Sequence, residues 1–300
     1  MGATRGNYSD QFLTDALPLL EGLIYEEYEK QPDHVPDVFN VLPSSSWGEQ
    51  SSTTAGPAAA TEKVEGDPSA ESNPLQGYDK TYTHLTYSVL SNFSYELVQD
   101  DRLGFVQKSF RQQGMSLFQT EQVTAWNVFN NGFADVGPDG GSLFNTAHTM
   151  IDGGSYANRP STDIALSIAG IREMEVDLAR QINHRNLNIL VMPYCVIVPP
   201  EQMQTGEELI GSPDRPDTAN RAINTFYKKN YKLKVIPFLT STTAWFATTM
   251  PDYHELRFYR RQAPETDTWI DRPTRDVVNS TWSRISVGYS DYIGSWGTSG

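Results

Sequence analysis

The chain has 300 residues and a formal net charge of −14 at neutral pH, because 37 acidic residues outnumber 23 basic ones. This charge disfavours binding to nucleic-acid backbones or anionic membranes through overall charge, since both rely on Lys and Arg. The single cysteine, Cys195, excludes an intrachain disulfide, and the apolar run around it indicates a small core residue. The longest apolar run, 189–198, is about half of a membrane-spanning helix and contains Pro193.

The N-terminal quarter of the chain predicts an arm followed by a long loop. Apolar residues near helical spacing predict an amphipathic helix over 10–30, and the Pro-rich stretch after it makes 1–43 an arm rather than a domain. Residues 44–77 are mostly Ser, Thr, Ala, Gly, Pro and Glu, a composition that cannot offset its own ordering entropy by apolar burial. This segment is either a disordered linker or a loop that orders against another chain. The β-like, aromatic pattern of 78–87 favours the loop.

The middle of the chain predicts two helices separated by a loop. The first helix covers 100–132, with a break near Gly114. Residues 133–160 are rich in Gly and Asn and predict an irregular loop. Ser161 or Thr162 then caps a long amphipathic helix with a stripe of Ile and Leu.

The rest of the chain is predicted to be mostly strand, with one helix. That helix opens at Pro199-Pro200 and stops at Gly211. The strand candidates are 188–198, 231–236, 243–249, 255–261 and 281–289. Helices and strands in this mixture indicate the α+β class, and no internal repeat is present.

Catalytic motifs are scarce. The sequence has no nucleotide-binding GxGxxG or GxxxxGK[ST], no zinc-binding HExxH and no GxSxG nucleophile elbow, so we expect no cofactor and no metal. The best catalytic-looking pair is His148 with Asp152, which could act as the acid–base couple of a hydrolase. The alternative, which we favour, is that His148 hydrogen-bonds the backbone of its irregular loop.

Two groups of residues suggest contacts with another surface. Arg257, Arg260 and Arg261 are interleaved with acidic residues such as Glu265, a pattern typical of salt bridges at a surface or a subunit contact. Aromatic residues also crowd the Gly-rich C-terminal tail, and large amphipathic rings in such a tail indicate anchoring against another surface.

Several segments in order along the chain resemble a known family. The chain resembles the major capsid proteins of tailed phages with the Hong Kong 97 fold, in particular the Mu-type major head subunit family. No single motif is diagnostic, but the order and spacing over roughly 90–300 are specific. The segments are Asp100-Asp101 with Gly104, Leu143–Thr149 (LFNTAHT), Asn158 with the helix after Ser161, Val196–Pro200 (VIVPP), Val235–Trp245 (VIPFLTSTTAW), His254–Arg261 (HELRFYRR) and Arg284–Gly288 (RISVG).

The resemblance implies a layout of five parts. The parts are an N-terminal arm lying along neighbouring subunits (1–43), an extended loop reaching over an adjacent subunit (44–90), a peripheral domain with its spine helix (91–160), an axial domain around five-fold and six-fold centres (161–250), and C-terminal strands that return to the peripheral domain (251–300).

The resemblance also implies a function. The chain is expected to be a non-enzymatic major head protein that assembles, in the host cytoplasm, into an icosahedral virion shell around double-stranded DNA, which it does not bind specifically. Expected partners are further copies in hexamers and pentamers, a separate scaffolding protein, a portal and decoration proteins, with no membrane. Alternatives are an encapsulin-like compartment shell and the His148–Asp152 hydrolase. Candidate subunit-contact residues are Trp47, Lys63, Tyr78, Arg257, Arg260, Glu265, Tyr292 and Trp296.

Overall fold

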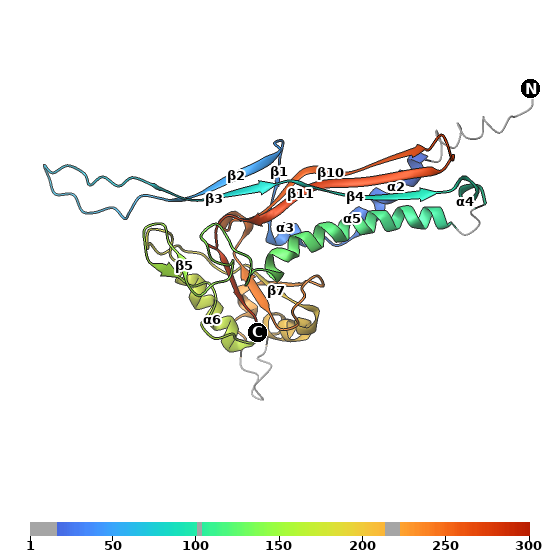
Figure 1. The fold of residues 1–300 in the computed structure, drawn as a ribbon. Coiled ribbons are helices and arrows are strands. Elements are labelled where there is room, and N and C mark those ends of the chain that lie inside the picture. Colours follow the sequence, from blue (N-terminus) through green and yellow to red (C-terminus); the bar gives the residue numbers. More distant parts are fainter. Residues whose placement is uncertain (1–16, 101–103, 214–222) are drawn as a thin grey trace, which may run out of the picture.

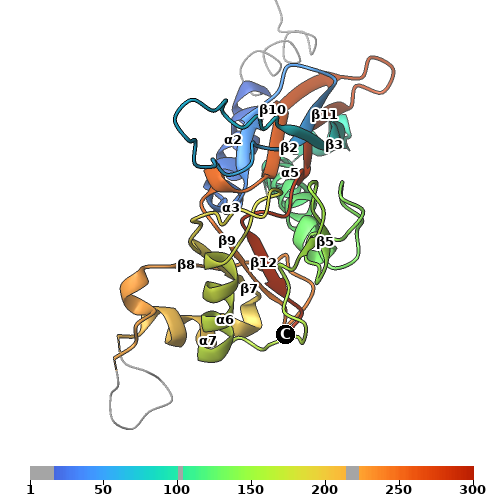
Figure 2. The ribbon, with the colours of Figure 1, turned by 90° about the vertical axis from the view of Figure 1, so that its left-hand side faces the viewer.

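The computed structural model describes residues 17–100, 104–213 and 223–300. The chain forms a long, narrow layer of strands and helices, a second body beneath one end of that layer, and a two-stranded hairpin that projects from the same end (Figure 1). Figure 2 views the molecule from the hairpin's side and shows the second body below the long layer. The fold is mixed α and β, as the sequence predicts.

A four-stranded sheet with strand order β1-β10-β11-β4 forms the long layer. β10 and β11 make a long antiparallel hairpin, β4 pairs antiparallel with β11, and β1 pairs parallel with the start of β10. The pairing of β10 with β11 is interrupted by register shifts between Arg260 and Glu265. The four strands are β1 (Asn40–Pro43), β4 (Leu85–Phe93), β10 (Leu256–Ile270) and β11 (Val277–Tyr289).

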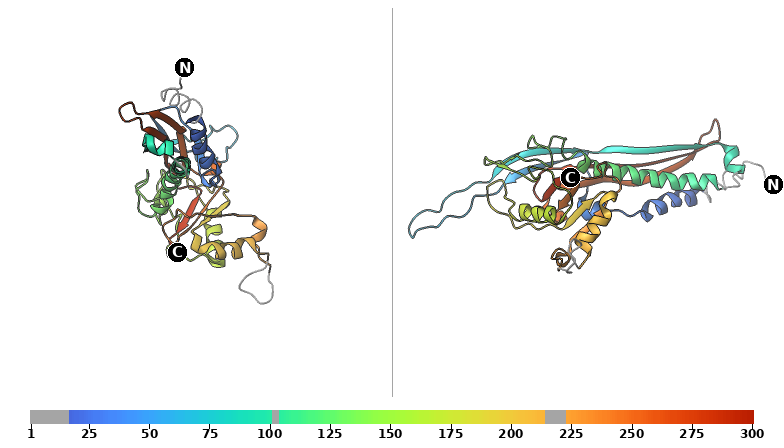
Figure 3. Two further views of the ribbon diagram at one scale, coloured as in Figure 1. Left: turned by 90° about the vertical axis from the view of Figure 1, so that its right-hand side faces the viewer. Right: turned by 90° about the horizontal axis from the view of Figure 1, so that it is seen from below.

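One long helix, α5 (Phe105–Asn130), lies along this sheet, and α2 (Leu17–Lys30) lies beside it (Figure 3). The predicted break near Gly114 is wrong, because α5 continues through it. Gly114 is where α2 comes closest: a Cβ there would lie 2.4 Å from the carbonyl oxygen of Ile24. The glycine therefore permits a close helix–helix contact instead of ending a helix.

The described part of the N-terminal segment packs on its own chain. Leu17, Leu20 and Ile24 are buried in one cluster with side chains of β4, α5 and β11. Tyr28 donates a hydrogen bond to Glu121 of α5 over 2.7 Å. The arm 1–43 lying along neighbouring subunits stays a prediction; within one copy, the apolar stripe of α2 packs on the chain's own α5. Residues 1–16 lie outside the described residues.

The second body contains a four-stranded sheet of order β12-β9-β7-β8. Its strands are short and mostly buried: β7 (Cys195–Val198), β8 (Lys232–Val235), β9 (Trp245–Thr248) and β12 (Ser295–Thr298). The helix α6 (Ile168–Ala179) packs on it through Ile171, Met174 and Leu178. α6 starts later than predicted, because Ser167, and not Ser161 or Thr162, caps it by accepting a hydrogen bond from the amide of Gly170.

An aromatic core joins the two sheets. Phe129 at the end of α5 and Phe246 of β9 lie 5.2 Å apart between ring centroids, and Phe144 from the following loop lies 5.0 Å from Phe246. Phe258 of β10 and Ile285 of β11 belong to the same buried cluster. Both bodies therefore share one close-packed core.

Shorter elements complete the chain. The predicted helix after Pro199-Pro200 is confirmed as a continuous helical stretch that ends at Gly211. The predicted strands are confirmed in position, although β7 is shorter and β10 and β11 are longer than the sequence pattern indicates. The remaining elements are α3 (Val35–Val38), α4 (Tyr95–Asp100), β5 (His148–Thr149), β6 (Ser155–Tyr156), α7 (Met203–Gly206) and one-turn helices at Pro200–Gln202, Tyr227–Lys229 and Pro251–Tyr253.

Candidate functional site

The most exposed feature of the molecule is the hairpin of β2 (Gly48–Ala55) and β3 (Leu75–Thr83) with its loop, 56–74. The loop at the tip of the hairpin points away from both bodies (Figure 1), and every residue of 56–74 is exposed. Its small, polar and Pro-rich composition offers nothing with which to build a core of its own. The segment therefore projects as a loop and does not fold back on the chain.

The base of this loop is held firmly. Arg185 donates to the carbonyl oxygens of Gly56 over 2.9 Å and Asn73 over 2.6 Å, so it bridges the two arms where they leave the hairpin. The same guanidinium makes an ion pair with Asp152 over 3.2 Å. A planar guanidinium donates several hydrogen bonds in fixed directions, so its bonds to two backbone carbonyls orient the loop where it joins the hairpin.

The hairpin also rests on the outer face of the long sheet. Tyr82 of β3 is buried, its ring lies edge-on to Tyr259 at 5.0 Å, and its hydroxyl lies 2.6 Å from Ser290 Oγ. Gly288 makes room for this ring, because a Cβ there would lie 3.1 Å from it. Burial raises the pKa of Tyr82 above its ordinary value, so its hydroxyl stays protonated.

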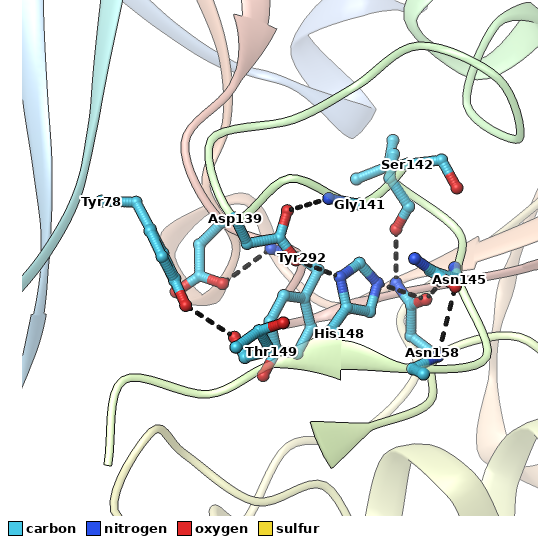
Figure 4. A network of polar contacts seen from close by, with 12 residues as sticks. Tyr78, Asp139, Gly141, Ser142, Asn145, His148, Thr149, Asn158 and Tyr292 are labelled. Carbon is cyan, nitrogen blue, oxygen red and sulfur yellow. Dashed lines mark hydrogen bonds and ion pairs between the residues drawn. The ribbon is translucent and has the colours of Figure 1, made fainter. Parts of the chain in front are cut away.

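A buried polar network joins the loop 133–160 to the C-terminal tail (Figure 4). His148 is fully buried and stacks on Tyr292, with ring centroids 3.9 Å apart. Its Nδ1 lies 2.6 Å from a carboxylate oxygen of Asp139, and its Nε2 lies 2.9 Å from Oδ1 of Asn158. Two distant stretches of sequence, the loop 133–160 and the C-terminal tail, therefore meet at one imidazole.

The orientation of the Asn158 amide fixes the protons of this network. Its Oδ1 accepts from the backbone amide of Asn145, and its Nδ2 donates to the carbonyl of Leu143. His148 Nε2 therefore donates to Asn158 Oδ1, and its Nδ1 faces the carboxylate of Asp139. Burial opposes the charge on Asp139, but the hydrogen bond and charge of His148 outweigh it and hold the pKa of Asp139 below its ordinary value.

The predicted couple of His148 with Asp152 is wrong. Asp152 pairs with Arg185, and His148 binds Asp139 and Asn158. The favoured alternative, that His148 binds backbone, is also wrong, because both of its ring nitrogens face side chains. A fully buried imidazole with both nitrogens engaged reaches no substrate, so its role is to hold the loop in place.

Sequence reasoning missed Asp139, Asn158 and Arg185 as structural anchors. Asp139 lies nine residues before His148 in a turn that no helical or strand spacing predicts. Asn158 belongs to one of the segments that carry the family resemblance, which was the only available signal. Nothing in the local sequence marks Arg185 as the residue that reaches the loop.

Of the eight proposed contact residues, three are exposed and five are buried or bound to other residues of the chain. Trp47 and Lys63 lie exposed on the hairpin, and Glu265 lies exposed on β10, where it accepts a hydrogen bond from Gln262. Three of the other five bind residues of their own chain: the Tyr78 hydroxyl donates to the carbonyl of Thr149, Arg257 pairs with Glu255, and Arg260 pairs with Glu121. The last two, Tyr292 and Trp296, are buried.

Tyr292 and Trp296 therefore correct one expectation. Trp296 is fully buried in β12, and its indole donates to Asp177 over 2.9 Å. Tyr292 stacks between His148 and Tyr156. These rings anchor the tail inside the chain's own core instead of against a neighbour, because β12 pairs with β9 and seals the second sheet.

Other chemistry has little support in the described residues. Cys195 is buried, and burial raises the pKa of its thiol to about 12, which confirms a core cysteine. Across 17–100, 104–213 and 223–300, no group of three or more His, Cys, Asp or Glu side chains is placed to hold a metal ion. The helices of the same ranges include none with the length and apolarity to cross a bilayer.

Known proteins resemble this chain at two levels. A family model described as phage capsid protein matches residues 77–296. No curated protein sequence matches the chain significantly. The match begins within β3 and ends within β12, so it spans α5 and both four-stranded sheets except for β1.

Solved structures share the fold at low sequence identity. A virus-like particle from Pyrococcus furiosus aligns with a TM-score of 0.57 at 6% identity, covering 95% of this chain and 99% of that one. Microbacterium phage Oxtober96 aligns with a TM-score of 0.57 at 11% identity, covering 89% and 92%. The capsid of bacteriophage JBD30 decorated with minor capsid protein trimers aligns with a TM-score of 0.56 at 11% identity, covering 70% and 92%.

Proposed function

Because this chain belongs to the phage capsid protein family, we propose that its copies form the icosahedral head of a tailed bacteriophage around double-stranded DNA. The protein is structural rather than enzymatic, with the Hong Kong 97 fold of phage capsids. It is a major capsid protein of a virion shell. Membership of the Mu-type subfamily and assembly in the host cytoplasm are finer parts of this proposal.

The projecting loop 56–74 is the single observation that carries the proposal. Arg185 binds the base of this exposed segment, and the rest of it makes few contacts. Ordering such a segment loses conformational entropy, which only contacts elsewhere can offset. A second copy of the chain provides such contacts. Segments that order on a partner wrap large surfaces at modest affinity per unit area, which suits a shell built from many contacts.

Repetition of one contact explains how a shell closes. A contact between two different surfaces of the same chain is heterologous, and repeated rotation by the same angle closes it into rings. We place the body of 161–250 around five-fold and six-fold centres, and the part 91–160 with the strands β10 and β11 at the periphery of each ring. The end of the expected C-terminal part 251–300 belongs to the first of these bodies, because β12 pairs with β9.

Charge fits a container that does not grip its contents. A net charge of −14 means that the shell would not hold packaged DNA by charge, so the strands can move as they enter. A scaffolding protein and a portal belong to the proposal as further partners. Decoration proteins do as well, and minor capsid protein trimers decorate the JBD30 capsid, whose chain this one resembles in fold.

A compartment shell holding cargo protein is the second candidate. It is favoured by the alignment that covers 99% of the chain of the Pyrococcus furiosus virus-like particle. Electron microscopy of the purified chain, over a range of concentration and salt, is expected to show shells or rings of five and six copies. A chain that stays monomeric under all conditions would refute both candidates, and nucleic acid inside native particles separates a phage head from a compartment.

A further inference from the structure

Among the described residues, no acidic side chain pairs with either of two arginines on the long sheet, Arg261 and Arg284. The Arg284 side chain makes no hydrogen bond or ion pair with any residue in 17–100, 104–213 or 223–300. The Arg261 side chain makes one hydrogen bond, of 3.3 Å, to the carbonyl oxygen of Ser44. Both side chains are half-buried, and the Nε atom of each is buried without a partner. A partly desolvated guanidinium without a carboxylate is an unfilled binding group.

The two arginines lie together at the base of the hairpin. Arg284 is paired in the sheet with Gln262, the neighbour of Arg261. Both arginines lie near His84. Burial lowers the pKa of His84, and the charges of Arg284 and Arg261 lower it further, so its imidazole is neutral at pH 7. A carboxylate that also acts on His84, that of Glu49, accepts a hydrogen bond from the hydroxyl of Ser44 over 2.6 Å and has no ion pair with either arginine.

The neighbouring basic residues differ from this pair because they are occupied. Arg257 pairs with Glu255, and Arg260 pairs with Glu121. The register shifts of β10 between Arg260 and Glu265 separate the occupied arginines from the unoccupied ones, since a bulge changes the direction of the side chains that follow it. The surface formed by Arg261 and Arg284 is called the arginine pair below.

The loop 56–74 carries the opposite charge. It contains Glu62, Glu65, Asp67 and Glu71 with one cation, Lys63, so its net charge is 1 − 4 = −3. All five side chains are exposed, and none has an ion pair within the described ranges. The loop points away from the sheet that carries the arginine pair, so the loop and the arginine pair of one copy do not meet (Figures 1 and 3).

We propose that the arginine pair of one copy is the receptor for the acidic loop 56–74 of a neighbouring copy. The inference rests on the proposed shell and names the two surfaces of its repeating contact. Each copy presents both surfaces at separate places, which is the heterologous arrangement that closes rings of one chain. Guanidinium–carboxylate pairs give such a contact its register and favour the correct neighbour over others.

A charge swap tests this pairing. The double variant Arg261→Glu/Arg284→Glu is expected to raise the concentration needed for half-assembly at least about tenfold, because like charges then face each other. Adding Glu65→Lys/Asp67→Lys to the same chain returns the net charge to −14 and is expected to restore assembly to within about threefold. Light scattering measures assembly, and circular dichroism verifies that each unassembled variant is folded.

A matched control separates the site from overall charge. Lys108 and Arg111 are two exposed cations on α5, so Lys108→Glu/Arg111→Glu makes the same change in net charge. Adding Glu65→Lys/Asp67→Lys to this control is expected not to correct any loss of assembly. Normal assembly of the arginine variant, or equal rescue of the control, would overturn the pairing. Normal shells of the unaltered chain in the same experiment would leave the proposed function standing.

Discussion

Shortening the projecting loop separates folding from assembly. Deleting residues 59–71 joins Ala58 to Ser72, whose hydroxyl already accepts a hydrogen bond from the Ala58 amide over 2.8 Å. The two carbonyls that Arg185 binds, at Gly56 and Asn73, are retained. The shortened chain therefore keeps the contacts that hold the base of the loop.

The expected change in stability follows from loop entropy. The deleted residues are all exposed, so no apolar burial is lost. The deletion shortens the loop roughly threefold, and each doubling of a loop costs about 0.6 kcal/mol to close, so the free energy of unfolding should rise by about 1 kcal/mol. Assembly should nevertheless fail, because the contact with a neighbouring copy is gone.

Two measurements on the same preparation check this reasoning. Urea unfolding of the unassembled subunit gives the free energy of unfolding, and light scattering with electron microscopy reports assembly. A loss of more than about 2 kcal/mol would mean that the loop packs on its own chain, since exposed residues do not carry that much stability. Normal shells from the shortened chain would refute the assigned role of the loop.

Three further predictions concern the interior. Asp139→Asn should remove a stabilising contribution that is present above pH 3.8 and is lost as the pH falls through the lowered pKa of Asp139. Between pH 6 and 2.5, the melting temperature of the variant should therefore fall less with pH than that of the unaltered chain. An equal fall in both would contradict the pairing with His148. Gly114→Ala should destabilise the chain by about 1–3 kcal/mol in urea unfolding, because the added methyl meets the Ile24 carbonyl; an unchanged midpoint would argue against close packing of α2. Cys195 should react with thiol reagents at pH 8 only after unfolding, since burial raises its pKa to about 12, and rapid labelling of the folded chain would contradict its buried position.

Periodic patterns predicted the elements but not every boundary. The apolar positions of α5 mark a helix along most of its length, because a helix face must repeat about every 3.6 residues. Gly114 was taken as a break because glycine is a poor helix former. The reason for a glycine there is the carbonyl of Ile24, far away in sequence, and local propensity cannot reveal it.

Exposure could be predicted for the loop but not for the tail. The loop 56–74 lacks large apolar side chains apart from Val64, so its exposure follows from composition. Trp296 and Tyr292 look like exposed anchors beside glycines, yet β12 pairs with β9 and buries both. Such a long-range pairing leaves no periodic trace in a four-residue strand.

The polar anchors depend on topology. His148 was recognised as unusual, but its partners Asp139 and Asn158 were not, because turns rather than regular elements bring them together. Arg185 reaches the loop from a segment more than 100 residues away. Residues of this kind become visible only when the fold is known.

The position of residues 56–74 in an assembled particle tests the central claim most directly. A cryo-electron microscopy map of particles from the unaltered chain should show this loop resting on a neighbouring copy, with its acidic side chains near Arg261 and Arg284. A map in which the loop of every copy contacts only the chain it belongs to would contradict the account.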